Sequence, residues 1–241
     1  MAQATYYFVA ASALGGPLRE VSFVVPTGNF GDIFAGYAAA QMGLPVANLV
    51  IASNANDILP RTVATGRYEM RDVKATSSPS MDIQISSNFE RYLFEASGRD
   101  AALIRGFMGA LKQSGSFDLG TLTPTLQKQF KAASASEEEV ADAIRRTHSE
   151  AGYLADPHTA CAIVAADKTL GREGGPAQVI LATAHPAKFP DAIQTITGHR
   201  PELPERLACL MTAPERFEVL PADLGAIERY IEGAARALAK A

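Results

Sequence analysis

The sequence contains no tryptophan, only two cysteines and no excess of positive charge. Cys161 and Cys209 lie 48 positions apart and neither belongs to a C-x-x-C pair, which argues against a disulfide framework or a cysteine-rich zinc site. Lysine and arginine together number 22 against 26 aspartates and glutamates, a net charge of −4. Because binding to a nucleic-acid backbone requires positive charge, we expect no nucleic-acid partner.

Long apolar runs are absent as well. Residues 1–18 are uncharged, but no lysine or arginine precedes this stretch and Gly-Gly-Pro at 15–17 interrupts it, unlike a secretory signal. Glycine, proline and asparagine interrupt the uncharged residues 33–56, which fall short of the ~20 apolar residues that a membrane-spanning helix needs. The sequence therefore predicts a cytoplasmic protein with no membrane partner.

What is present is typical of a folded protein. The 241 residues are 47% apolar and 20% charged, close to ordinary globular usage. Two short β-branched runs, 21–25 and 48–52, flank a helical pattern at 32–42, and a third strand is expected at 178–182. Such alternation is typical of β-α-β units, so we predict an α/β fold with a parallel sheet.

Residues 81–150 show a different pattern, in which helical periodicity dominates and a weak strand is expected only near Phe117. We interpret this range as a helix-rich insertion. Ser136 and Glu139 form a capping-box pattern that opens a helix to about residue 150, and Asp156-Pro157 begins another that leads to Gly171. A terminal helix is expected at 222–240, within the C-terminal segment 201–241.

A glycine-containing loop, Pro26-Thr27-Gly28-Asn29-Phe30-Gly31-Asp32, lies between a predicted strand and a predicted helix. The free N–H groups at such a helix start can bind a phosphate without a cationic side chain. The loop matches neither G-x-x-x-x-G-K-[ST] nor G-x-G-x-x-G, so a monophosphate is favoured over a triphosphate or a dinucleotide. The alternative is a tight turn in which Asp32 only caps the helix. If phosphate binds, the Asp32 carboxylate must point away from it.

The end of the third predicted strand offers a second group of polar residues at 181–190. In open α/β sheets the ligand crevice lies beyond the carboxyl ends of the strands, so Thr183 and the helix start after Gly31 could face one cleft. Alternatively, Thr183 and His185 only satisfy loop backbone groups. The four histidines, at 148, 158, 185 and 199, show no metal-ligand spacing, and we expect no metal site.

Four segments together resemble threonine synthase. They are Thr27–Asp32, Ser80–Arg91, Asp156–Ala160 and Thr183–Pro190, in the same order as in that family, and the resemblance extends back to Tyr6-Tyr7-Phe8. It implies a pyridoxal 5′-phosphate (PLP) enzyme of the tryptophan synthase β-like fold, a carbon–oxygen lyase acting on a phosphate ester. The implied reaction, in threonine biosynthesis, converts O-phospho-L-homoserine and water to L-threonine and phosphate.

The resemblance also implies roles for particular residues. The loop formed by Gly28, Asn29, Phe30, Gly31 and Asp32 matches the family's cradle for the cofactor phosphate, and Thr183 matches the hydroxyl residue that faces the pyridine nitrogen. A neutral hydroxyl does not hold that nitrogen protonated, so it tunes the ring as an electron sink. The segment that contains Ser87, Asn88 and Arg91 receives no catalytic role, and we expect a core-facing helix there with Arg91 exposed.

One departure from the family concerns lysine. The family's Schiff-base lysine lies in its N-terminal half, and none of the seven lysines, at 74, 112, 128, 131, 168, 188 and 240, lies in that motif. Lys188, close to Thr183, is the only substitute to consider, but a lysine near the ring nitrogen would lie on the wrong side to reach the aldehyde. No catalytic residue is therefore assigned.

The resemblance thus implies that residues 1–241 are the C-terminal part of the PLP-binding domain, with the N-terminal half of the family absent. We expect such a chain to be inactive alone, with the missing half or self-association as its partner interaction. Two alternatives are a non-catalytic phosphate-, PLP- or protein-binding module derived from threonine synthase, and an unrelated α/β phosphate-binding protein.

Overall fold

The computed structural model describes residues 2–235 of the chain. Contacts within the chain define two units, Met1–Glu202 and Leu203–Ala241. The second unit contains the short 3₁₀ helix η4 (Glu205–Met211) and α10 (Leu224–Ala234). The predicted helix at 222–240 is therefore found, but its residues from 236 onward, Leu238 and Lys240 among them, lie outside the described residues.

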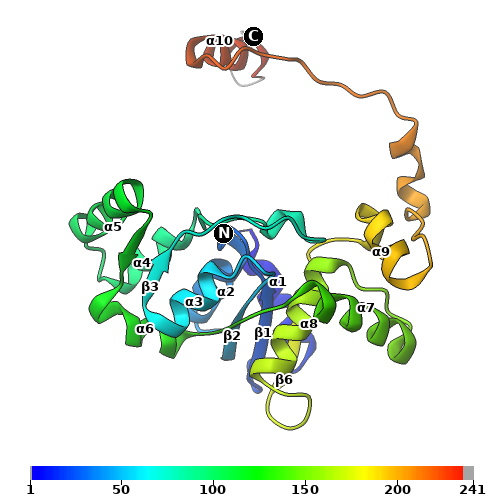
Figure 1. The fold of residues 1–241 in the computed structure, drawn as a ribbon, viewed down its shortest axis with the longest axis horizontal. Helices are drawn as coiled ribbons and strands as arrows, with labels where there is room; N and C mark the ends of the chain where they lie inside the picture. Colours follow the sequence, from blue (N-terminus) through cyan, green and yellow to red (C-terminus); the bar gives the residue numbers. More distant parts are fainter. Residues whose placement is uncertain (1, 236–241) are drawn as a thin grey trace. The chain divides into compact units, whose positions relative to one another are not determined.

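The first unit alternates strands and helices (Figure 1). In chain order its elements are α1 (Ala4–Ala13), β1 (Val21–Pro26), α2 (Gly31–Gln41), β2 (Val46–Ser53), α3 (Ile58–Thr65), β3 (Arg67–Glu69), η1 (Pro79–Met81), α4 (Phe89–Ala96), α5 (Ala101–Ser114), β4 (Ser116–Asp118), η2 (Gly120–Leu122), α6 (Thr123–Gln129), β5 (Phe130–Ser134), α7 (Glu137–Ala151), α8 (Pro157–Thr169), β6 (Ala177–Ile180), η3 (Pro186–Lys188) and α9 (Pro190–Thr197).

Four strands form a parallel sheet in the order β5-β2-β1-β6. Val24 at the centre of β1 pairs with Val50 of β2 on one side and with Ile180 of β6 on the other. The predicted α/β class and its parallel sheet are confirmed. Because the strands are parallel, the chain leaves β1 and β6 at the same edge of the sheet, where the two loops singled out in the sequence follow.

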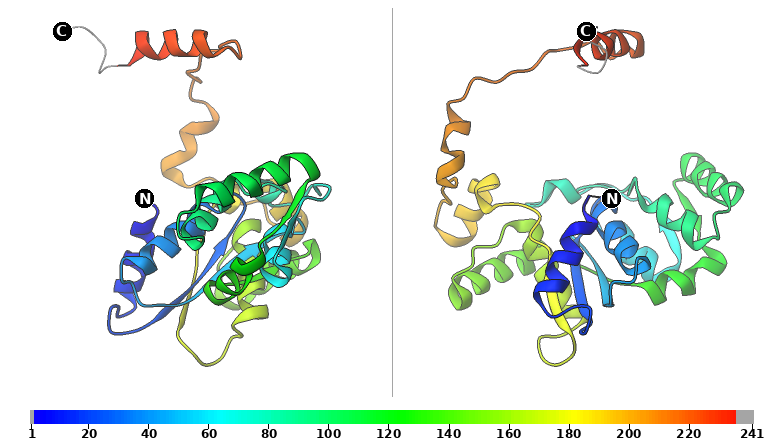
Figure 2. Two further views of the ribbon diagram at one scale, coloured as in Figure 1. Left: turned by 90° about the vertical axis from the view of Figure 1, so that its left-hand side faces the viewer. Right: turned by 180° about the vertical axis from the view of Figure 1, so that it is seen from behind.

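All six residues of β1 are buried and only Ser22 among them is polar, as expected for a parallel strand covered on both faces of the sheet. Phe23 and Val25 belong to the core shared with α1 and α2, whereas Val24 belongs to a core shared with Ala162 and Ala165 of α8. The small side chains of α8 allow this helix to lie close against the strands. Seen from behind in the right-hand view of Figure 2, α1 (dark blue) lies over the opposite face.

The range 81–150 is helical but not exclusively so. It contains α4, α5, α6 and α7, and the weak strand near Phe117 is β4, which pairs antiparallel with β3. It also contains β5, which the sequence pattern did not predict and which pairs with β2 from Leu49–Phe130 to Ser53–Ser134. The segment Phe-Lys-Ala-Ala-Ser has no β-branched residue, so its strand conformation comes from pairing with β2 rather than from intrinsic preference.

Two predicted helix starts are confirmed atom by atom. The Ser136 hydroxyl accepts from the Glu139 N–H, and the Glu139 carboxylate accepts from the Ser136 N–H, which completes the capping box of α7. Asp156 caps α8 by accepting from the His158 N–H, with Pro157 in the first turn. Among residues 2–235, no helix combines the length and apolar character required to cross a bilayer.

The contact between α1 and α2 depends on a residue without a side chain. A Cβ on Gly36 of α2 would lie 2.5 Å from Cε1 of Tyr7 and 3.0 Å from Cδ2 of Leu49. Overfilling a packed core costs about 1–3 kcal/mol, so we expect Gly36→Ala to lower the free energy of unfolding by about that amount in urea titrations.

Gly106→Ala is the matched control because Gly106 lies inside α5 and no atom lies within 4 Å of its added Cβ. Alanine favours a helix over glycine by about 0.5–1 kcal/mol, so this variant is expected to be slightly more stable than the parent. Equal stability of Gly36→Ala and Gly106→Ala would contradict the tight packing of α1 on α2.

Candidate functional site

The loop from β1 to α2 exposes a row of backbone N–H groups. The Thr27 N–H makes the last sheet hydrogen bond, to the Ala52 carbonyl at 2.7 Å, and the Phe34 N–H makes the first helical one, to the Phe30 carbonyl at 3.1 Å. Within the described part of the chain, the N–H groups of residues 28–32 have no protein acceptor. Such a row at the start of an eleven-residue helix attracts anions.

Phe30 shapes this loop through both its backbone and its side chain. Its φ of +67° places it in the left-handed region, which is rare for a residue with a side chain. The ring is buried against Phe89, Tyr92 and Phe130, with centroid distances of 5.1, 6.0 and 5.5 Å. Phe30 therefore anchors the loop in the core, and only its backbone remains available to a ligand.

The segment before α4 holds the loop from the other side. Asn88 donates to the Asn29 carbonyl through its backbone N–H at 2.9 Å and its side-chain amide at 2.8 Å. The Ser86 hydroxyl donates to the Gly28 carbonyl at 2.8 Å. These bonds use the loop's carbonyls and leave its N–H groups free. Asn88 and Ser86 thus position the loop, a role that the sequence did not reveal.

Gly28 has a steric role in the same contact. A Cβ at this position would lie 2.8 Å from the Ser80 carbonyl oxygen, so only glycine allows the two backbones to approach this closely. The Ser80 segment is itself fixed by a polar cluster beyond β2, in which the Asn54 and Asn56 amides donate to Asp82 at 2.7 and 3.0 Å.

The Asp32 carboxylate is turned toward α1. Its Oδ1 accepts from the Tyr7 hydroxyl at 3.1 Å, and the same hydroxyl contacts the Asp32 carbonyl at 2.8 Å. Burial raises the pKa of Asp32 above its usual value, although the hydrogen bond from Tyr7 lowers it. The pKa of Tyr7 is raised by burial and by the nearby Asp32 carboxylate.

The loop and the third strand meet at one pocket. Gly28 and Asp32 line a cavity of about 210 Å³ together with Thr183 and Lys188, and a neighbouring cavity of about 440 Å³ is also lined by Asp32 and Thr183. Two segments far apart in the sequence thus share one cleft, as expected. His185 lies outside this lining, and its side chain accepts from the Ala187 N–H at 3.2 Å, so it satisfies loop backbone.

A buried polar pair at the start of α8 adjoins the same cavity. His158 lines the cavity, and its Nδ1 lies 3.1 Å from Oδ1 of Asp156, while the Thr159 hydroxyl donates to Oδ2. Burial raises the pKa of Asp156, but the hydrogen bonds from His158 and Thr159 outweigh burial and hold it below its usual value. The sequence identified Asp156 as a helix cap but gave no sign that His158 reaches the pocket.

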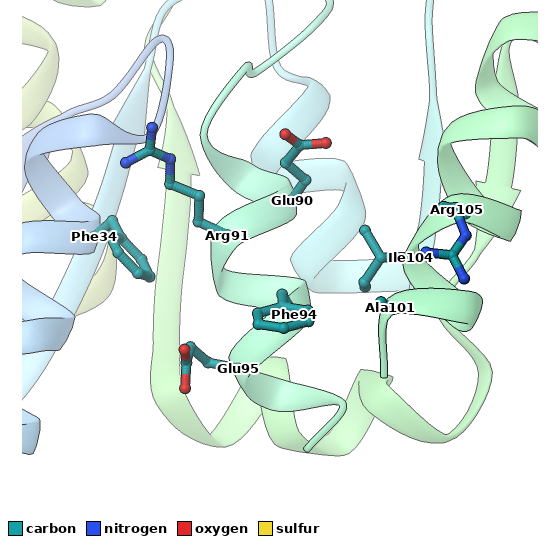
Figure 3. A pocket seen from close by; sticks show the side chains of 8 residues that line it. All are labelled: Phe34, Glu90, Arg91, Phe94, Glu95, Ala101, Ile104 and Arg105. Atoms are coloured by element: carbon teal, nitrogen blue, oxygen red, sulfur yellow. The ribbon is translucent and has the colours of Figure 1, made fainter. Parts of the chain in front are cut away.

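A larger pocket lies elsewhere on this unit. It has a volume of about 540 Å³ and is formed by α2, α4 and the start of α5 (Figure 3). Phe34, Phe94 and Ile104 supply apolar walls, while acidic and basic side chains of both signs surround them. No serine, threonine, cysteine, lysine or histidine lies among the lining residues. Arg91 is exposed on α4, as expected.

Metal binding receives no support from the side-chain arrangement. Over residues 2–235, no group of three His, Cys, Asp or Glu side chains could hold a metal ion. The polar side chains that line the smaller cavity belong to Gln3, Asp32, Ser80, His158, Thr183 and Lys188, and Gly28 adds its backbone. The Lys188 ammonium and the free Gly28 N–H are hydrogen-bond donors that suit a phosphorylated ligand.

Comparison with known proteins gives a consistent result. Residues 159–231 match the family model described as threonine synthase, C-terminal. Threonine synthase of Pseudomonas aeruginosa is 44% identical over 96% of the chain, and PLP-bound threonine synthase from Brucella melitensis has a TM-score of 0.88 and 52% identity over 97% of it. Yeast threonine synthase has a TM-score of 0.82 and 36% identity over 96% of the chain. The chain spans about half the length of each of these three proteins.

The Asp156 network predicts a measurable pH effect. Because the folded pKa lies below the unfolded value of about 3.9, the unfolded state binds the proton first as pH falls, and stability from Asp156 is lost from about pH 5 downward through the folded pKa. Asp156→Asn keeps a capping side chain but removes the charge. We expect it to lower stability by about 1–2 kcal/mol at pH 7, with a smaller difference at pH 3.

Asp142→Asn is the matched control, since the exposed Asp142 of α7 pairs only with Arg145 at the surface. Its loss is expected to change stability by less than about 1 kcal/mol and to leave the acid slope of the parent intact. Urea titrations between pH 3 and 7 measure both effects. If the stability of Asp156→Asn and that of the parent fell equally steeply with falling pH, the stabilising role of the Asp156 carboxylate would be contradicted.

Proposed function

Because this chain belongs to the threonine synthase family and corresponds to its C-terminal half, we propose that it supplies the phosphate-binding part of a threonine synthase active site. The family resemblance of the four sequence motifs is confirmed, as is the fold class. The reaction proposed for the complete site converts O-phospho-L-homoserine and water to L-threonine and phosphate.

The observation that carries the proposal is the row of unbonded N–H groups at residues 28–32, whose two end residues, Gly28 and Asp32, line the cavity that Thr183 also lines. We propose that these N–H groups bind the phosphate of PLP and that the Thr183 hydroxyl faces the pyridine nitrogen. The site fits the cofactor in donor chemistry, since the groups presented are hydrogen-bond donors suited to an anion. When bound, PLP supplies an electron sink for charge that develops on the substrate.

Residues of this chain prepare the site before any ligand arrives. The Gly28 and Asn29 carbonyls are held by Ser86 and Asn88, and this fixes the N–H groups of Asn29 and Phe30, which belong to the same planar peptide units. The Asp32 carboxylate accepts from Tyr7, which directs its charge to α1. Preorganised donors of this kind bind an anion without a reorganisation cost.

Catalysis is proposed to need a second chain segment. Covalent attachment of the cofactor requires an amine placed at its aldehyde, and the family resemblance puts that lysine in the N-terminal half. We propose that the chain alone binds phosphate but forms no threonine, and that an N-terminal half completes the site. The half-length match to the relatives supports this. The second candidate function is a non-catalytic binding module, which the half-length match to the relatives also favours. The cytoplasmic location stays a prediction.

Binding is tested with 4′-deoxypyridoxine 5′-phosphate, a PLP analogue without the aldehyde, which separates phosphate recognition from reaction with lysine. The chain is expected to bind it, and to bind 4′-deoxypyridoxine without the phosphate much more weakly. Gly28→Ala forces the loop away from Ser80 and should weaken binding at least tenfold in calorimetric titrations. Gly106→Ala is the control with unchanged affinity, and circular dichroism verifies that both variants fold. Unchanged affinity in Gly28→Ala would refute the proposal that the loop at residues 28–32 binds the phosphate.

Catalysis is tested by incubating the chain with PLP and O-phospho-L-homoserine and measuring threonine by chromatography. No threonine is expected from the chain alone, and addition of an N-terminal half from a full-length relative is expected to produce it. Threonine formation by the chain alone contradicts the half-enzyme proposal. Failure of the supplied half to restore the reaction favours the non-catalytic module.

A further inference from the structure

His158 carries a polar atom with no partner. Its Nε2 is buried and has no hydrogen-bond partner among the described residues, and the side chain is only 5% exposed. The other ring nitrogen, Nδ1, is engaged by Asp156. A buried polar atom without a partner destabilises the fold, so its retention at the wall of a cavity calls for an explanation.

The surroundings of His158 favour a ligand over a structural role for Nε2. One face of its ring packs against Phe189, with centroids 4.9 Å apart, and the Lys188 ammonium lies 5.7 Å from the centre of that same phenyl ring. His158, Lys188 and Gly28 all line the cavity of about 210 Å³. An imidazole and an ammonium therefore flank the space beside the free N–H groups of the loop.

We propose that Nε2 of His158 donates a hydrogen bond to a phosphate monoester bound in this cavity, and that binding places a proton on the imidazole. This inference rests on the proposed phosphate site. The Asp156 carboxylate accepts from Nδ1–H, so a neutral His158 presents Nε2 only as an acceptor. An oxygen of a phosphate dianion is also an acceptor, and the contact forms only when Nε2 takes up a proton from solution.

Binding should consequently weaken as pH rises. The charged residues that line the cavity with His158 are Asp32 from α2 and Lys188 from η3. Asp156, at the start of the same helix, contacts Nδ1 of His158. A dianionic ligand beside Nε2 favours the protonated imidazole. Because Asp32 could also take up a proton beside an anion, the test must separate the two residues.

The experiment measures affinity and proton uptake by titration calorimetry between pH 7.0 and 8.5, in buffers of different ionisation enthalpy. Two probes, 4′-deoxypyridoxine 5′-phosphate and O-phospho-L-homoserine, distinguish a cofactor phosphate from a substrate phosphate. For the parent chain we expect uptake of up to one proton and an affinity that falls by up to about tenfold per pH unit. An effect confined to one probe identifies the phosphate that His158 contacts.

Three variants isolate His158. His158→Gln keeps a donor near the position of Nε2 but does not titrate, so it should bind within about threefold of the parent at pH 7.0 and lose the proton uptake due to the imidazole. His158→Leu has no donor and should bind at least tenfold more weakly. His148→Gln, at the exposed end of α7, should behave like the parent. Urea titration of each variant verifies folding.

The outcomes separate this inference from the proposed function. If the parent chain binds neither probe, both proposals fail. If it binds a probe but His158→Gln and His158→Leu retain the parent's affinity and proton uptake, the phosphate site stands and the role of His158 is overturned. Proton uptake that persists in His158→Gln assigns the proton to another group such as Asp32, which also overturns it.

Discussion

The structure depends on one constraint at the junction of β1 and α2, where five successive backbone N–H groups are kept free of protein acceptors. The first N–H groups of any helix lack intrahelical partners, and here the free row extends back through the loop to Gly28. Here Ser86 and Asn88 bind the loop's carbonyls, Phe30 fixes its backbone through a buried ring, and Gly28 lets the Ser80 backbone close over it. Each contact favours the conformation that leaves the donors available.

The surrounding fold stabilises the loop in this conformation. Phe30 packs among aromatic rings from α4 and β5, and the Ser80 segment is held by the buried amides of Asn54 and Asn56 acting on Asp82. Because the parallel strands β1 and β6 are neighbours, the loop after β6 adds Thr183 to the same cavity. Rigid elements thus position a site whose own polar groups are unsatisfied, as expected where a ligand completes the bonding.

His158 likewise presents a polar group that has no partner in the protein, in this case a side-chain nitrogen. The Asp156 carboxylate fixes one edge of the imidazole, and the other edge carries a buried nitrogen without a partner. Gly28 and Asp32, at the two ends of the row of backbone donors, line the same cavity as His158. We propose that one phosphorylated ligand satisfies both the backbone donors and this nitrogen.

The sequence by itself determined the elements whose signals are local. The apolar runs of β1 and β2, the capping box of α7 and the Asp156-Pro157 start of α8 all arise from contacts within a few residues, and they appear where predicted. The order of the four motifs likewise sufficed to identify the family. Only the tertiary structure decided that β5 is a strand, because Phe130–Ser134 gains its conformation by pairing with β2. It alone also brought His158 and Lys188 beside Gly28, because proximity between distant segments comes from sheet order and packing, which no local pattern encodes.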